Sequence, residues 1–174
     1  MSIAEKLTLI AENEQKVYNA GYEKGKAEGG DNDFLDLRTN GGKNFGYLYC
    51  AMNHLITAPV IDTSKGTNFT NFCNGCSALV TIPLIDLSSA TNTYNAFNGC
   101  SKLQNITFEG TIPISISFSS CSALSDISIE NIITTLKDLT GQTAQTLTLH
   151  NTVGSKLTDE QKAIITAKNW ELVY

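Results

Sequence analysis

Residues 72–103 read FCNGCSALVTIPLIDLSSATNTYNAFNGCSKL, and the phrase NGCSAL near the start of this stretch returns as NGCSKL at its end. The cysteine of the first phrase, Cys76, is followed 24 residues later by Cys100. The same offset relates Pro59 to Pro83. A match that extends over a whole unit, including its small polar residues, predicts one structural unit used several times.

Two further copies flank this pair. A shorter one, FSSCSALSDISIE, places Cys121 21 residues after Cys100, and a degenerate one, YLYCAMNHLITAPVID, has Met52 at the cysteine position. Four repeats therefore cover about residues 47–130. A unit of about 24 residues cannot bury a core alone, so the repeats are expected to stack on one another as a solenoid.

The segment after each cysteine has the spacing L-x-x-I-x-L, which in the second repeat is Leu79, Ile82 and Leu84. An alternation of apolar and polar residues predicts a short strand, here with both apolar residues facing inward. The last, shorter copy is expected to follow the same pattern with Ile127 and Ile129. Stacked strands of this kind would form a parallel β-sheet along one face.

The outward positions of that sheet are the candidate ligand-binding residues. Side-by-side Ile61 and Ile85 on an outer face would form an apolar contact patch; the alternative is that these positions are only solvated. The full set of candidates is Thr57, Thr81, Asn105, Asp126, Ile61, Ile85 and Glu109.

The five cysteines include a CxxC pair, Cys73 and Cys76. Stacked repeats would align Cys76, Cys100 and Cys121 in one column of small buried groups. Disulfide formation and metal or redox chemistry are the alternatives. No second CxxC or suitably spaced histidine pair completes a tetrahedral metal site, so buried structural thiols are favoured and no metal is expected.

The N-terminal residues 2–20 have a helical pattern, and residues 21–30 are rich in glycine and charge. Ile3, Leu7, Ile10 and Val17 form a narrow apolar seam at the heptad spacing. A helix with so narrow a seam requires a partner. It either folds back on its own domain or joins copies of the chain as a homo-oligomer. We expect residues 1–30 to be this helix and its linker, and 31–174 to be the body.

Residues 131–174 depart from the repeat and are expected to cap its open end. A strand is predicted at residues 146–149. The segment LTDEQKAIITAKNW predicts a helix capped by Thr158, with Gln161 completing a capping box. The final WELVY predicts a closing strand.

Composition excludes several classes of function. The net charge of −5 argues against nucleic acid as a partner, because phosphate binding needs clustered Lys and Arg. The chain has neither a signal-peptide pattern at its start nor an apolar run of 18 residues, so no membrane insertion is expected. We find no catalytic constellation and no cofactor motif. The repeated Asp62 and Asp86 are expected to accept hydrogen bonds from nearby backbone amides.

The phrases NGCSALVTIPLIDLSS and FNGCSKLQNI resemble the BspA-like leucine-rich repeats of bacterial surface proteins, with F-x-x-C-S-x-L as the recurring core. The terminal segments look like those flanking such repeats in proteins encoded by phages and prophages of anaerobic gut bacteria. The resemblance implies an α/β repeat fold: a short leucine-rich-repeat solenoid with a parallel β-sheet face, an N-terminal helix and a C-terminal helix-strand cap.

The same resemblance implies a non-enzymatic protein that binds a protein or glycan on a cell surface. The few repeats, the missing signal and the N-terminal helix favour a virion component, a phage tail or fibre-associated protein acting in host recognition. The alternative is a bacterial cell-surface adhesin module that binds a host glycan or protein. A glycan hydrolase is disfavoured, because no pair of carboxylates stands apart from the repeat.

Overall fold

The computed structural model describes residues 42–174. The predicted helix at residues 2–20, with its seam of Ile3, Leu7, Ile10 and Val17, lies outside the described residues, as does the linker that follows it. The described elements, in chain order, are β1 (Thr81–Asp86), β2 (Asn105–Glu109), β3 (Ile116–Phe118), α3 (Asp126–Thr135), β4 (Gln145–Leu149), α4 (Asn151–Gly154), α5 (Asp159–Ala167) and β5 (Trp170–Val173).

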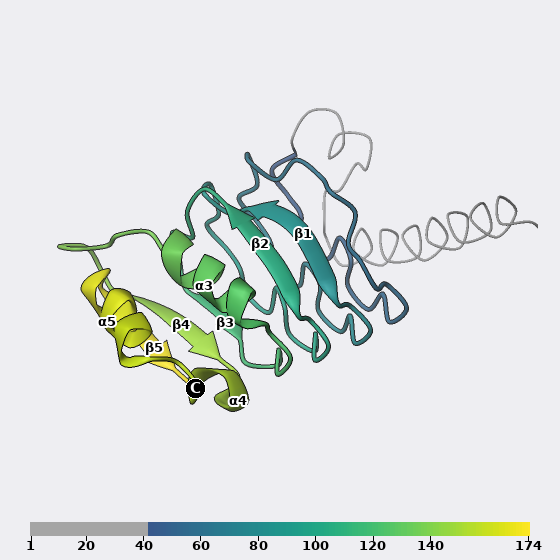
Figure 1. Ribbon diagram of the computed structural model, residues 1–174. Coiled ribbons are helices and arrows are strands. Elements are labelled where there is room, and N and C mark those ends of the chain that lie inside the picture. The colour runs from purple at the N-terminus through teal and green to yellow at the C-terminus, as the bar shows by residue number, and fades with distance from the viewer. Residues whose placement is uncertain (1–41) are drawn as a thin grey trace, which may run out of the picture.

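Successive repeats lie against one another through backbone hydrogen bonds. The N–H of Phe45 donates to the carbonyl of Asn68 at 2.8 Å, and the N–H of Phe69 donates to the carbonyl of Asn92 at 2.7 Å. The side-chain amide of Asn68 also donates to Asn44 Oδ1, 24 positions earlier, at 3.0 Å. The repeat interval read from the sequence thus reappears as contacts between neighbouring turns of the chain (Figure 1).

The prediction of a leucine-rich-repeat solenoid with a single parallel sheet face is nevertheless wrong. The strands of residues 42–174 form two separate parallel sheets, one of two strands in the order β1-β2 and one of three in the order β3-β4-β5. Three helices accompany these sheets in the same residues. Figure 1 shows α3 beside β2, with α5 and β5 at the far end of the body.

The repeat before β1 does not form a regular strand, although its sequence has the same pattern. There Thr57 forms only an isolated parallel bridge with Thr81. Pro59 does not explain the difference, because its counterpart Pro83 lies within β1. The first sheet is therefore limited to β1 and β2.

Helix α3 takes the place of the strand that was expected in the last repeat. Ser125 caps it by accepting a hydrogen bond from Ser128 N, and the first turn contains Asp126. Ile129, Ile132 and Ile133 are buried at the i, i+3, i+4 spacing of a helix. The strand expected through Ile127 and Ile129 is therefore replaced by a helix, and Ile127 is 83% exposed instead of facing inward.

A β-bulge changes which residues of β1 face the core. The pairing of β1 with β2 shifts register between Ile82 and Ile85. Ile85 is only 1% exposed, whereas Leu84 is 38% exposed. The strict alternation assumed from the sequence would have made Ile85 an outward residue, and the extra residue of the bulge reverses this.

The predictions for the C-terminal segment are confirmed for its helix and for both of its strands, the first of which is β4 (Gln145–Leu149). Gln161 N donates to Thr158 Oγ1 at 3.2 Å, and Thr158 N donates to Gln161 Oε1 at 3.0 Å, so the capping box forms at the start of α5. After α5, Asn169 adopts a left-handed backbone with φ of 61° and reverses the chain. Strand β5 then pairs in parallel with β4.

One continuous core runs through these elements. Phe97 stacks on Phe118 with ring centroids 5.0 Å apart and meets Phe72 and Phe108 edge to face. The cysteines and repeat leucines fill the space beside these rings. None of the helices in residues 42–174 has the length and apolar character needed to cross a membrane.

Candidate binding groove

The structure brings together part of the predicted sheet-face site. Thr57 bridges to Thr81, and Thr81 pairs with Asn105 in the β1-β2 register, so these three residues form a row. Asp126 belongs to the first turn of α3 instead of a strand. Ser125, just before it, donates to Asn105 Oδ1 at 3.4 Å, which places this helix start beside the row.

The apolar part of that predicted site is not formed as expected. Ile85 is buried and Ile61 is half-buried, so the two do not make an exposed patch. Val60 and Leu84, at 63% and 38% exposed, are the apolar residues that reach solvent there. Glu109 pairs with Asp86 at the end of β2, as a register partner.

A different region is hollowed into an open groove of about 500 Å³. Three segments far apart in the sequence form it: the turn at residues 91–95, the start of β3 with the residues before it, and strand β4. None of the lining side chains carries a charge. The groove residues are Thr91, Asn92, Thr93, Tyr94, Asn95, Ile114, Ser115, Ile116, Ser117, Gln145, Thr146 and Thr148.

Tyr94 is the most conspicuous side chain of the groove, because a large aromatic residue here is 68% exposed. Its backbone is held from both sides: Tyr94 N donates to Asn92 Oδ1 at 3.0 Å, and Asn71 N donates to the Tyr94 carbonyl at 2.8 Å. Asn95 follows with φ of 54°, a left-handed conformation that asparagine tolerates better than most residues. The ring therefore projects from a well-fixed turn.

Ser115 connects the three segments of the groove. Its N–H and its hydroxyl both donate to Gln145 Oε1, at 2.8 and 2.9 Å. The same hydroxyl accepts from Thr146 N at 2.9 Å, and the Ser115 carbonyl accepts from the buried Thr93 hydroxyl at 2.6 Å. The polar walls are thus assembled by hydrogen bonds within the protein before any ligand arrives.

Several hydrogen-bonding groups of the groove are left for a ligand. The carbonyl oxygens of the Asn92 and Gln145 side chains are used, but their NH₂ groups make no hydrogen bond to another described residue. Thr148, which pairs with Ser117 across β3 and β4, contributes a further hydroxyl at the groove wall. The groove can therefore donate and accept hydrogen bonds around an aromatic surface.

Sequence reasoning missed this groove, although it contained one signal. The stretch GTNFTNF of the preceding repeat has Thr70 at the position where TNTYNAF has Tyr94. An aromatic residue at a turn position that is polar in the preceding copy is not needed for the repeat itself. The contributions of β3 and β4 could not be read in the same way, because their residues lie about 20 to 50 positions after Tyr94 in the sequence.

The two repeated aspartates act as predicted within their turns. Asp62 Oδ1 accepts from Ser64 N at 3.0 Å, and Asp86 Oδ1 accepts from Ser88 N at 2.7 Å. The hydroxyl of Ser64 also donates to Asp62, and this hydrogen bond together with that from the backbone amide lowers the pKa of the Asp62 carboxyl. These interactions stabilise the turn.

The five cysteines are free and buried, as the structural interpretation of the column predicted. The thiols of Cys76, Cys100 and Cys121 donate to backbone carbonyls of the neighbouring repeat at 2.8, 3.1 and 3.5 Å. Burial raises the pKa of Cys73 and of Cys100, and it raises the pKa of Cys121 to about 12. Enclosed thiols with a raised pKa are poor nucleophiles, whereas a hydrogen bond from the Cys73 thiol lowers the pKa of Cys76.

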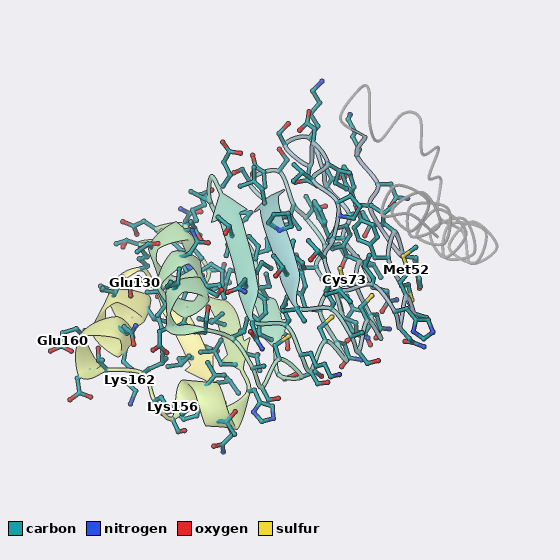
Figure 2. The ribbon with its side chains drawn as sticks, turned by 45° about the vertical axis from the view of Figure 1, so that its right-hand side comes forward. Met52, Cys73, Glu130, Lys156, Glu160 and Lys162 are labelled. Carbon is teal, nitrogen blue, oxygen red and sulfur yellow. The ribbon has the colours of Figure 1, made fainter. Side chains whose placement is uncertain are left out.

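Figure 2 shows Cys73 within the body and Met52 farther from the labelled charged residues. Within residues 42–174, no group of three or more His, Cys, Asp or Glu side chains is arranged to hold a metal ion. The groove around Tyr94 joins an exposed aromatic ring to polar groups that could contact another molecule. Comparison with protein-family models, curated proteins and solved structures returned no match for this chain.

Proposed function

We propose that this chain is a non-enzymatic binding protein that recognises a cell surface, as a phage tail or fibre-associated component. The resemblance of its repeats and terminal segments to bacterial surface and phage-encoded proteins suggests this setting. In this proposal the groove around Tyr94 makes the contact. A bacterial surface adhesin that binds a host glycan or protein is the second candidate.

The observation that carries the proposal is the composition of the groove. It joins an exposed aromatic ring to pre-assembled amides and hydroxyls. The lining contains no carboxylate, imidazole, thiol or amine that could act as a general base or acid. Concave sites with an apolar surface and a few fixed polar groups are typical of recognition sites.

A charged side chain in the groove is expected to abolish cell binding. Thr148→Lys adds a long cationic side chain to the β4 wall, where it would obstruct a ligand without entering the core. Labelled full-length protein and this variant would be compared on intact bacteria and on animal-host cells by flow cytometry. Binding to bacteria favours the phage component, and binding to host cells favours the adhesin.

Thr81→Lys is the matched control, because it places the same charge on the β1-β2 sheet. We expect it to bind like the parent protein. Loss of binding in Thr81→Lys with retention in Thr148→Lys would move the site to the row of Thr57, Thr81 and Asn105. If the parent protein bound neither kind of cell, the proposed function would be wrong.

The phage-component proposal also expects self-association through the N-terminal seam. Light scattering of the full chain should give the mass of a dimer or trimer, and the double variant Leu7→Asp, Ile10→Asp should give a monomer. Two buried charges at a helix seam have no partners and would oppose assembly. A monomeric parent chain would remove this support and favour the adhesin.

A further inference from the structure

Resting on the proposed function, we infer that the ligand of the groove is a neutral oligosaccharide, with one pyranose ring stacked on Tyr94. The inference draws on three properties of the described residues: the exposed ring, the nearby amide NH₂ groups that have no hydrogen-bond partner among these residues, and the absence of charge in the lining. Each of these matches a property of an uncharged sugar.

The aromatic ring matches the apolar face of a pyranose. The face of an aromatic ring carries partial negative charge, which attracts the partly positive C–H groups that gather on one side of a sugar ring. Tyr94 is 68% exposed and its turn is anchored at Asn92 and Asn71, so the turn loses little conformational entropy when a ligand covers the ring. Pre-organisation of this kind reduces the entropy lost on binding.

The amides match the hydroxyl groups of a sugar. The side chains of Asn92 and Gln145 keep free NH₂ donors while their oxygens are held by Tyr94 N and by Ser115. A sugar hydroxyl accepts from such a donor and can donate to a neighbouring threonine hydroxyl. Because these side chains are fixed from the oxygen side, the direction of each donor is set before binding.

The charge distribution disfavours an ionic ligand. An acidic sugar would lose hydration in the groove without meeting a cationic partner. Glu171 of β5 is the register partner of the groove residue Thr146, and its negative charge would repel an anion. Figure 2 shows the labelled charged residues Glu130, Lys156, Glu160 and Lys162 gathered toward the helical end of the molecule.

A glycan array tests the ligand class directly. The labelled full chain would be applied to neutral, sialylated, sulfated and amine-bearing oligosaccharides, and the best neutral binder would be titrated by calorimetry. We expect binding to neutral glycans only. Tyr94→Ala should weaken the affinity about fivefold or more, since stacking of an aromatic surface contributes on the order of 1 kcal/mol. Tyr94→Trp should retain it.

Tyr174→Ala is the matched control, because it removes a second exposed tyrosine that lies outside the groove. Its affinity should equal that of the parent. Thermal unfolding of each variant would show that an affinity change is not a loss of fold. Equal affinities for Tyr94→Ala and Tyr174→Ala would overturn the stacking assignment.

The outcomes also separate this inference from the proposed function. If the parent chain binds cells through the groove but only acidic glycans bind, or only protease treatment of the cells removes the binding, the neutral-sugar inference is wrong and the function stands. Failure of the parent chain to bind cells or any glycan would refute both. Competition of cell binding by the neutral binder would support both.

Discussion

Cys100→Asp is expected to leave the body of the chain unfolded. Cys100 is 0% exposed and its thiol donates to the Cys73 carbonyl at 3.1 Å. A carboxylate at this place would face a carbonyl oxygen, with no cation nearby to compensate its lost hydration. We expect a loss of more than about 4 kcal/mol in the free energy of unfolding, against a total of about 5–15 kcal/mol for a typical domain.

Circular dichroism during heating would measure this effect, with Ser101→Asp as its control. Ser101 is the next residue and is exposed, so the same charge there should change stability by no more than about 0.5 kcal/mol. If Cys100→Asp unfolded cooperatively at the same midpoint temperature as the parent, the cysteine column would be open to water and the packing described above would be wrong.

Phe97→Ala is expected to cost about 3–5 kcal/mol, the usual range for removing a buried phenylalanine. The ring is 1% exposed and stands at the junction of the core. It stacks on Phe118 at 5.0 Å and meets Phe72 and Phe108 at 6.5 and 6.4 Å. Its loss would open a cavity shared by three repeats, and these large rings cannot close it by small shifts.

Urea unfolding would compare the stability of Phe97→Ala with that of Tyr94→Ala, a variant in the same turn of the chain. Tyr94 is 68% exposed, so its removal should leave stability within about 0.5 kcal/mol of the parent while the affinity for the glycan falls. Phe97→Leu should fall between the two, because it keeps part of the buried volume. A loss below 1 kcal/mol for Phe97→Ala would mean that the core repacks around the missing ring.

Much of the local structure could be predicted because it depends on near neighbours. The capping box of Thr158 and Gln161 and the Asp62 turn are formed within two or three residues, so their chemistry is visible in the sequence. The buried column of Cys76 and Cys100 follows from the repeat interval alone. Periodicity identifies residues that occupy equivalent places, even when it does not show the shape of the sheet.

The errors arose where two local patterns competed. The residues after Cys121 satisfy the strand spacing of the earlier repeats, but Ile129, Ile132 and Ile133 also satisfy a helical spacing, and the Ser125 cap favours the helix. At Ile85 the error was one residue, because a bulge in β1 reversed the face of every later side chain in that strand.

By itself the sequence determined the repeat interval, the cysteine column of the core and the helix and strand that close the chain, since these depend on periodicity and on contacts between near neighbours. Only the tertiary structure decided that the strands divide into two sheets and that Tyr94 shares a groove with Ser115 and Gln145. The physical reason is that the groove depends on the register between β3 and β4, which joins residues about 30 positions apart through hydrogen bonds that no local pattern encodes.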